Sequence, residues 1–236
     1  LMTDGAAIAA RVKSDNGILG AFAYRNENIE EKIANVFRLA EKFDVELDFH
    51  IDEGLEKEAT GFDTVVSYAK TFGMKKKVLC GHACSLSLRN KSYLFGLLDK
   101  VAKAEIGLTC LPTTNLWLQD NAEGRTPRLR GLAPIIEARN SGVSVMIASD
   151  NCQDSFYPFG NYDMLSTYRT AVLSAHLNED SWFDSITSIP TDWMGNNSEI
   201  KEGAEASFLL FKADSINDLM SNSANSFEVW CNGALV

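Results

Sequence analysis

The chain has 236 residues, which is long enough for one large domain or for one domain with a small appendage. A hydrophobic content of 45% with 10% aromatic residues excludes an intrinsically disordered chain. The 22 basic and 32 acidic residues give a net charge of −10, so we expect neither a nucleic acid polymer nor an anionic membrane as partner, while a small neutral or cationic substrate is compatible.

Apolar runs of strand length alternate with amphipathic segments along the first 177 residues. Strands are predicted over residues 18–24, 45–50, 78–81, 107–111 and 143–148. Helices are predicted over residues 5–13, 29–43, 61–72, 93–104, 132–140 and 164–177, with Asp4 and Asn28 as caps of the first two. Residues 112–130 are predicted to be a long polar connection. Strands and helices that alternate at this spacing predict βα units with a parallel sheet, which is the α/β class.

Side chains that can bind metals or carry protons follow three of the predicted strands. His50 ends the second strand in V-E-L-D-F-H, and Glu53 comes three residues later. His82 follows the third strand in V-L-C-G-H, and Asp150 follows the fifth in V-S-V-M-I-A-S-D. A neutral imidazole is a good ligand for a divalent metal, and a carboxylic acid one turn away can carry protons. Functional residues at the carboxyl ends of parallel strands are typical of a (β/α)8 barrel, although only five units are recognisable.

Each of these residues also has a purely structural explanation when it is taken alone. His50 could be a surface histidine near acids, His82 a histidine satisfied at the sheet edge, and Asp150 a turn cap. Their shared position at one end of one sheet favours a joint site. His176, in A-H-L-N-E-D, is predicted to be structural.

Several other enzyme classes lack their motifs in this sequence. No G-x-G-x-x-G or G-x-x-x-x-G-K-[ST] follows a strand, so a nucleotide-binding doubly wound sheet has little support. The thiolate zinc deaminases need H-x-E and P-C-x-x-C, whereas His82-Ala83-Cys84 lacks the glutamate and no Cys-x-x-Cys occurs. A serine hydrolase is not supported because G-x-S-x-G is absent.

The cysteines and the apolar runs bear on the compartment. The five cysteines, at positions 80, 84, 110, 152 and 231, are odd in number and irregularly spaced. With no secretory signal recognisable, this pattern favours a reducing cytoplasm over a disulfide framework. No apolar run approaches the roughly 20 residues that span a bilayer. We therefore predict a cytoplasmic protein.

After Pro190 the pattern changes to short strands without long helices. Strands are predicted over residues 206–212, 227–231 and 234–236, and the Asn232-Gly233 step before the last is a hairpin signal. We therefore expect two units, a barrel portion over residues 1–190 and a segment of a small β domain over residues 191–236.

Four motifs resemble, in order and spacing, those of the bacterial cytosine deaminase branch of the amidohydrolase superfamily. They are D-F-H-I-D-E over 48–53, G-H-A-C-S-L over 81–86, L-P-T-T-N-L-W-L-Q over 111–119 with Arg130-Gly131 beyond it, and A-S-D-N-C-Q-D-S-F-Y-P-F-G over 148–160. The end of the chain, from I-K-E-G-A-E-A-S-F-L-L-F to V-W-C-N-G-A-L-V, is similar to that family's small β-sandwich. The resemblance implies a partial TIM barrel of the metal-dependent hydrolase type, strands four to eight, with a remnant of the sandwich.

The resemblance also implies a role for each candidate residue. His50 and Asp150 would bind one divalent metal, zinc or iron. His82 would orient the metal-activated hydroxide, Asp150 would take its proton, and Glu53 would protonate a ring nitrogen as a cytosine-like heterocycle is deaminated. Substrate contacts would come from Glu53, Asn151 and Phe156.

Two departures from that family leave alternatives open. The His-x-His pair that supplies two more ligands is absent, and the chain opens at Leu1 in what reads as the tail of a helix. We therefore expect a C-terminal portion, which without those ligands could lack the metal and be catalytically incomplete.

The second departure is Asp150-Asn151, which stands where cytosine deaminases have Asp-Asp. It resembles the amidohydrolases that act on N-substituted aminotriazine rings, so such a ring is the alternative substrate. In addition, a partial barrel leaves an open sheet edge at residues 18–24, which predicts association, most simply as a homo-oligomer.

Overall fold

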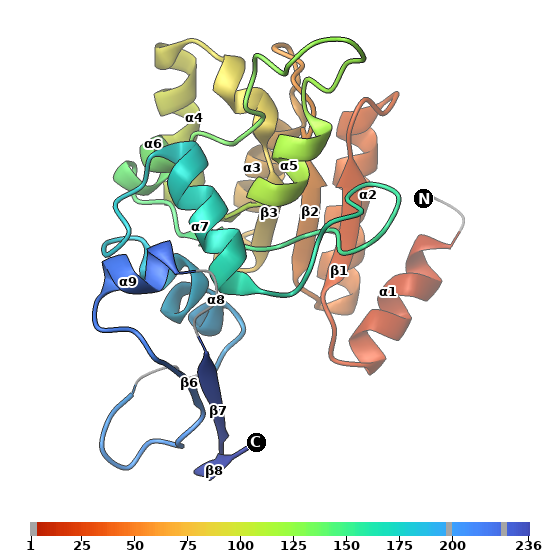
Figure 1. Ribbon diagram of the computed structural model, residues 1–236. Coiled ribbons are helices and arrows are strands. Elements are labelled where there is room, and N and C mark those ends of the chain that lie inside the picture. Colours follow the sequence, from red (N-terminus) through yellow and green to blue (C-terminus); the bar gives the residue numbers. More distant parts are fainter. Residues whose placement is uncertain (1–3, 197–199, 223–225) are drawn as a thin grey trace.

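The computed structural model describes residues 4–196, 200–222 and 226–236, and within these ranges it contains two sheets (Figure 1). The larger sheet has five parallel strands in the order β1-β2-β3-β4-β5. They are β1 (Leu19–Ala23), β2 (Leu47–Ile51), β3 (Val78–His82), β4 (Gly107–Cys110) and β5 (Val145–Ile147). The predicted α/β class with a parallel sheet is therefore confirmed.

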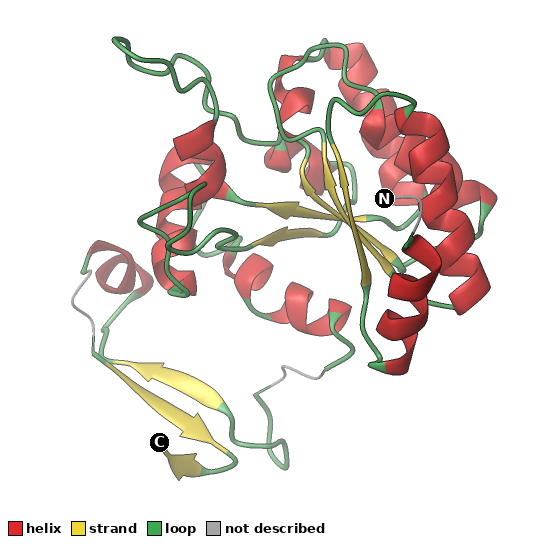
Figure 2. Ribbon diagram, turned by 90° about the vertical axis from the view of Figure 1, so that its right-hand side faces the viewer, coloured by secondary structure: helices red, strands yellow, loops and turns green. Residues whose placement is uncertain are grey.

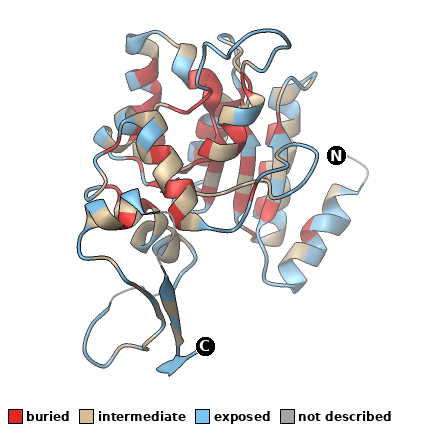
Figure 3. Ribbon diagram, viewed as in Figure 1, coloured by how far each residue is buried: buried red, intermediate tan, exposed pale blue. Residues whose placement is uncertain are grey.

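Helices connect successive strands and pack along the sheet (Figure 2). They are α2 (Ile29–Phe43), α3 (Gly61–Thr71), α4 (Lys91–Lys103) and α6 (Ile135–Asn140); α7 (Met164–Ala175) follows β5, and α1 (Gly5–Ser14) packs against α2. The core lies between these helices and the strands, where most buried residues are found (Figure 3). Phe37 of α2, for example, stacks on Phe49 of β2 with ring centroids 5.8 Å apart.

Burial alternates along β2, and this alternation separates the two faces of the sheet. Leu47, Phe49 and Ile51 are buried against the helices, whereas Asp48 is partly exposed and His50 is exposed. We call the face that carries Asp48 and His50 the inner face. A cavity of about 330 Å³ lies along it and is lined by both of these residues. The sequence pattern of β2 thus points a candidate ligand away from the core.

The helix α8 (Ser188–Trp193) covers part of the inner face. Trp193 approaches Gly107 of β4 so closely that a Cβ atom at position 107 would lie 2.7 Å from Trp193 Cζ2. The same Cβ would lie 2.8 Å from Leu79 Cδ1 and 3.0 Å from Met146 Cε. Glycine is therefore required here by the packing of an indole ring against the strand.

A short helix interrupts the predicted polar connection 112–130. This helix, α5 (Pro112–Leu118), was not predicted, and the prediction is wrong for this part. Its seven residues include two threonines and an asparagine, so no apolar periodicity indicates it. Pro112 in its first turn was the available signal, because a proline there gives up no helical hydrogen bond.

The two predicted cap residues stand at the N-cap positions of α1 and α2, but they do not cap these helices through their side chains. Neither Asp4 nor Asn28 makes a side-chain cap hydrogen bond, and Asn28 adopts a left-handed φ of 53°. Helix α4, by contrast, has a side-chain cap, because Asn90 Oδ1 accepts a hydrogen bond of 2.9 Å from the Tyr93 backbone N–H. That cap starts α4 two residues before the predicted position.

The second sheet is antiparallel and consists of β6 (Phe208–Phe211), β7 (Phe227–Cys231) and β8 (Ala234–Leu235), with α9 (Ile216–Ser221) between the first two. The predicted hairpin at Asn232-Gly233 is confirmed. Both residues have positive φ, 51° and 79°, as a type I′ turn requires. The expected unit boundary at residue 190 falls inside α8, and the division into two units stays a prediction.

Within the described ranges, we find no helix that combines the length and the apolar character needed to cross a bilayer.

Candidate active site

Left-handed backbone conformations mark the carboxyl ends of three strands. Asp52 after β2, His82 at the end of β3 and Asp150 after β5 have φ values of 46°, 70° and 65°. Such values are uncommon for residues other than glycine and cluster at functional sites. At His82 the left-handed φ directly affects where the side chain lies. The register pairs His82 with the buried Ile51, yet its ring contacts His50 on the inner face. The strand exit therefore brings a side chain out of the regular alternation and into the site.

His82 lies at the centre of a chain of three polar side chains. Its Nε2 atom is 3.0 Å from His50 Nδ1, and its Nδ1 atom is 3.0 Å from Asn115 Nδ2. The side chain of His82 is 1% exposed, and Asn115, from α5, is also 1% exposed. Glu53 Oε1 lies 3.7 Å from His82 Nδ1. Two predicted catalytic residues and one predicted ligand thus meet in the structure.

Donor atoms of His50, His82 and Asp150 all lie within 4.8 Å of one another. Imidazole nitrogen and carboxylate oxygen are donor types that suit zinc or iron. Asp150 Oδ2 is buried, and it has no hydrogen-bond partner among the residues that the structure describes. An unpaired buried carboxylate oxygen is costly unless something such as a cation binds it. The residues present therefore fit a divalent metal.

Burial controls the protonation of the groups around this cluster. It lowers the pKa of His82 to about 3, with a further contribution from His50, so the imidazole is neutral at pH 7. It also raises the pKa of Glu53, and the nearby Asp150 carboxylate raises it further. The pKa of Asp150 is raised by burial as well, while Thr114 and His50 act in the opposite direction. As a result, His82 is neutral, and the carboxyl groups of Glu53 and Asp150 hold a proton more tightly than usual.

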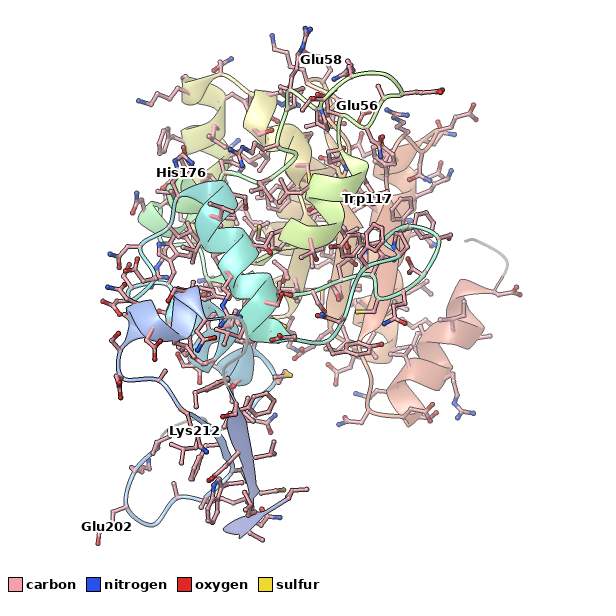
Figure 4. The ribbon with its side chains drawn as sticks, viewed as in Figure 1. Glu56, Glu58, Trp117, His176, Glu202 and Lys212 are labelled. Carbon is pink, nitrogen blue, oxygen red and sulfur yellow. The ribbon has the colours of Figure 1, made fainter. Side chains whose placement is uncertain are left out.

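The remaining predicted site residues lie outside this cluster. Asn151 Nδ2 donates a hydrogen bond of 2.6 Å to Asp154 Oδ2, within the loop that follows Asp150. Phe156 is on the same loop and is 58% exposed. Their predicted contacts with substrate stay predictions. His176 is exposed at the end of α7, away from Trp117 of α5 (Figure 4).

Sequence reasoning missed two buried residues beside the site. One is Asn115, which is described above as a partner of His82. The other is Asp52, which is 3% exposed and whose Oδ2 accepts a hydrogen bond of 2.8 Å from the Phe62 N–H at the start of α3. Burial raises the pKa of Asp52 to about 6, although backbone N–H groups of Phe62 and Gly61 oppose the shift. Asp52 was visible as an acid next to His50, but its role as the cap of a distant helix is a tertiary contact.

Three aromatic rings gather beside α5. Trp117 lies 5.2 Å from Phe159 and 6.2 Å from Tyr157, measured between ring centroids, and the last two rings are 6.2 Å apart. Trp117 is 40% and Phe159 68% exposed. This cluster connects the helix that carries Asn115 to the loop that carries Asn151 and Phe156.

Comparison with known sequences gives a consistent set of relatives. The sequence model of the Amidohydrolase family matches residues 3–236. The chain is 31% identical over 229 residues to a pterin deaminase of Rhizobium rhizogenes, covering 95% of this chain and 52% of the relative. It is 25% identical over 144 residues to an N-isopropylammelide isopropyl amidohydrolase of a Pseudomonas species, covering 61% of this chain and 32% of the relative. The chain thus spans about half the length, or less, of these curated relatives.

Solved structures match nearly the whole chain. A 5-methylcytosine deaminase of Klebsiella pneumoniae with bound 5-fluorocytosine superposes with a TM-score of 0.87 at 20% identity, covering 99% of this chain and 59% of that one. An N-isopropylammelide isopropylaminohydrolase of Burkholderia multivorans gives a TM-score of 0.80 at 20% identity, covering 98% and 58%. The fold of this chain therefore corresponds to part of the fold of these enzymes.

Proposed function

Because this chain belongs to the amidohydrolase family, we propose that it carries the metal-binding and proton-transfer groups of a metal-dependent aminohydrolase. The reaction is the hydrolytic removal of an amino group from a carbon of a nitrogen heterocycle. The observation that carries the proposal is the convergence of His50, His82 and Asp150 within 4.8 Å, with Glu53 beside them.

His50 and Asp150 would hold the metal from the ends of β2 and β5. The Asp150 oxygen, which has no hydrogen-bond partner among the described residues, and the exposure of His50 support this assignment. When bound, a divalent metal lowers the pKa of a coordinated water to around 7 and so supplies a nucleophile at neutral pH. The family's additional His-x-His ligands have no counterpart in this sequence.

The residues of the chain would divide the proton transfers among them. Asp150 accepts a proton as the water oxygen attacks the amino-bearing ring carbon. Glu53, whose pKa is raised, donates a proton to the adjacent ring nitrogen and so removes the negative charge that develops there. His82, which is neutral, makes a hydrogen bond to the attacking oxygen. Water and the amino-heterocycle are consumed, and an oxo-heterocycle and ammonia are released.

The substrate class we favour is an amino-substituted pyrimidine ring, either single or fused. The relative with 31% identity is a pterin deaminase, and one structural relative was solved with 5-fluorocytosine. Both names describe a six-membered ring in which a ring nitrogen adjoins the reacting carbon. A cytosine-like ring and a pterin-like ring are therefore the first two candidates.

A second candidate is an N-substituted aminotriazine ring, from which an alkylamine would leave in place of ammonia. Asn151 favours it, because an amide can donate a hydrogen bond where the second aspartate of cytosine deaminases only accepts. Two relatives are named for N-isopropylammelide.

The test is release of amine from three compounds, pterin, 5-methylcytosine and N-isopropylammelide, by the chain loaded with zinc or iron. We expect amine release with one of these rings. Glu53→Gln should lower kcat about 100- to 10,000-fold, as loss of a general acid does. Glu58→Gln is the matched control, because Glu58 lies on the same loop with a side chain that is 84% exposed (Figure 4).

The outcomes of this test separate the alternatives. A chain that does not retain zinc or iron would be identified as catalytically incomplete. Metal-loaded protein that releases no amine from any of the three rings would contradict the proposed function.

A further inference from the structure

His82 is held between two side chains, and their chemistry restricts where its proton is. On one side, Asn115 presents its Nδ2 atom to His82 Nδ1 at 3.0 Å. An amide nitrogen is a donor only, so His82 Nδ1 must offer a lone pair. A neutral imidazole carries one proton, and with Nδ1 as acceptor that proton is on Nε2.

The other contact of His82 is compatible with this tautomer. His82 Nε2 lies 3.0 Å from His50 Nδ1, and a hydrogen bond there needs a proton on one of the two nitrogens. With Nε2–H on His82, the ring donates to His50 Nδ1. Both atoms of the buried His82 ring that can make hydrogen bonds are then satisfied, as burial at 1% exposure demands.

We propose that Asn115 is a positioning residue, which fixes His82 as the Nε2–H tautomer and so holds it in the hydrogen-bond donor role that the proposed function gives it. A nitrogen that carries a proton has no lone pair for a metal. The three-residue donor group therefore divides into two ligands, His50 and Asp150, and one donor, His82. The assignment of the tautomer rests on the contact with Asn115 and on the orientation of its amide, while the use of the donor toward an attacking oxygen rests on the proposed function.

One neighbouring group favours the opposite tautomer. Glu53 Oε1 lies 3.7 Å from His82 Nδ1, and an ionised carboxylate at hydrogen-bond distance would attract a proton to that atom. The separation exceeds a hydrogen bond, whereas the amide of Asn115 is at a normal one. An Asn115 amide turned by 180° would present its oxygen and would also reverse the tautomer. The Nε2–H and Nδ1–H tautomers of His82 differ in which ring nitrogen carries the proton, and this difference can be measured.

The direct test is the nitrogen-15 NMR spectrum of the histidine rings in the full chain without metal. The sequence has three histidines, so His50→Gln and His176→Gln suffice to assign His82. The expected spectrum has a protonated Nε2 and an unprotonated Nδ1 on His82 at pH 7. An Nδ1–H tautomer of His82 in the wild-type chain would overturn the proposal, and this result requires neither metal nor substrate.

A variant can reverse the tautomer deliberately. Asn115→Asp places a carboxylate acceptor at His82 Nδ1, so the proton should move to Nδ1 and free the Nε2 lone pair. Asn140→Asp, at the exposed end of α6, makes the same chemical change away from the site and should leave the His82 spectrum unchanged. Circular dichroism of each variant shows whether it is folded. If Asn115→Asp does not fold, the wild-type spectrum alone decides.

Zinc binding by the metal-free chain gives the second readout. His50→Gln should weaken zinc binding at least about tenfold, whereas His82→Gln should change it less than about threefold. Asn115→Asp should strengthen zinc binding, because it turns His82 into an additional ligand. Equal losses for His50→Gln and His82→Gln would show that both are ligands and would reject the proposal. An inactive protein with the expected tautomer and zinc affinities would instead reject the proposed reaction and leave the assignment of Asn115 intact.

Discussion

His82 Nε2 lies 3.0 Å from His50 Nδ1, although the strand register pairs His82 with Ile51 and not with His50. The contact exists because His82 leaves β3 with a left-handed φ of 70°, which turns its ring to the inner face. The group that we propose to bind metal and substrate therefore depends on backbone geometry at the strand exits.

Metal binding should stabilise the chain through His50 and Asp150. At a free zinc concentration about 100 times the dissociation constant, the free energy of unfolding should rise by about 2.7 kcal/mol. Chelation should reverse the change, and His50→Gln or Asp150→Asn should abolish it. The measurement is thermal unfolding with and without zinc. His176→Gln is the control, since this exposed histidine at the end of α7 should leave the increment intact. Loss of the increment in that variant would place the metal elsewhere.

Asp52 should make the stability fall as the pH rises from about 4 to about 6. Its pKa in the folded chain is about 6, mainly because of burial, while an unfolded aspartate titrates near 3.9. Between these values the folded state binds more protons than the unfolded state, so raising the pH disfavours folding, by on the order of 2–3 kcal/mol in total. Asp52→Asn should remove this component, which denaturant unfolding at several pH values would measure. If the free energy of unfolding of Asp52→Asn varied with pH as it does in the wild type, this role of Asp52 would be contradicted. Asp99→Asn, on the exposed side of α4, is the matched control.

Gly107→Ala should destabilise the fold by roughly 1–3 kcal/mol, because the new methyl group meets Trp193, Leu79 and Met146 at 3.0 Å or less. Gly96→Ala is the control in α4. Apart from the backbone of its own helix, no atom of the described residues lies within 4 Å of the added Cβ, so the change should stabilise the helix by about 0.5–1 kcal/mol. Urea unfolding of the two variants gives both values. Equal stabilities for Gly107→Ala and wild type would show that α8 does not pack on β4 as described.

Asn90→Ala should cost about 1 kcal/mol, because the Asn90 side chain accepts the Tyr93 N–H and caps α4. Thr60→Ala should cost distinctly less. Thr60 precedes α3 but makes no side-chain cap bond, since the buried Asp52 takes the Phe62 N–H in its place. Chemical denaturation compares the two variants. A larger loss for Thr60→Ala than for Asn90→Ala would contradict the assignment of these caps.

Local sequence patterns were sufficient for the five parallel strands, the main helices and the last hairpin. Strand runs and helical stripes are set by periodicities of two and 3.6, and the Asn232-Gly233 turn is set by the positive φ that these residues tolerate. The same reasoning placed His50, His82 and Asp150 at one edge, because the carboxyl ends of parallel strands lie together. The short helix α5 was missed, since seven residues with several polar side chains carry no apolar stripe.

Only the tertiary structure decided how these residues are used. The backbone at His82 turns the ring into the site. Three contacts join residues that are 10 to 86 positions apart: Asn115 with His82, Asp52 with Phe62 at the start of α3, and Trp193 with Gly107. No periodicity encodes such contacts, because they depend on which side chain of one element reaches a particular atom of another. The sequence alone therefore determined the sheet and the edge at which the candidate ligands gather. The folded chain determined which nitrogen of His82 faces which neighbour, and the proposed division between metal ligands and hydrogen-bond donor rests on that arrangement.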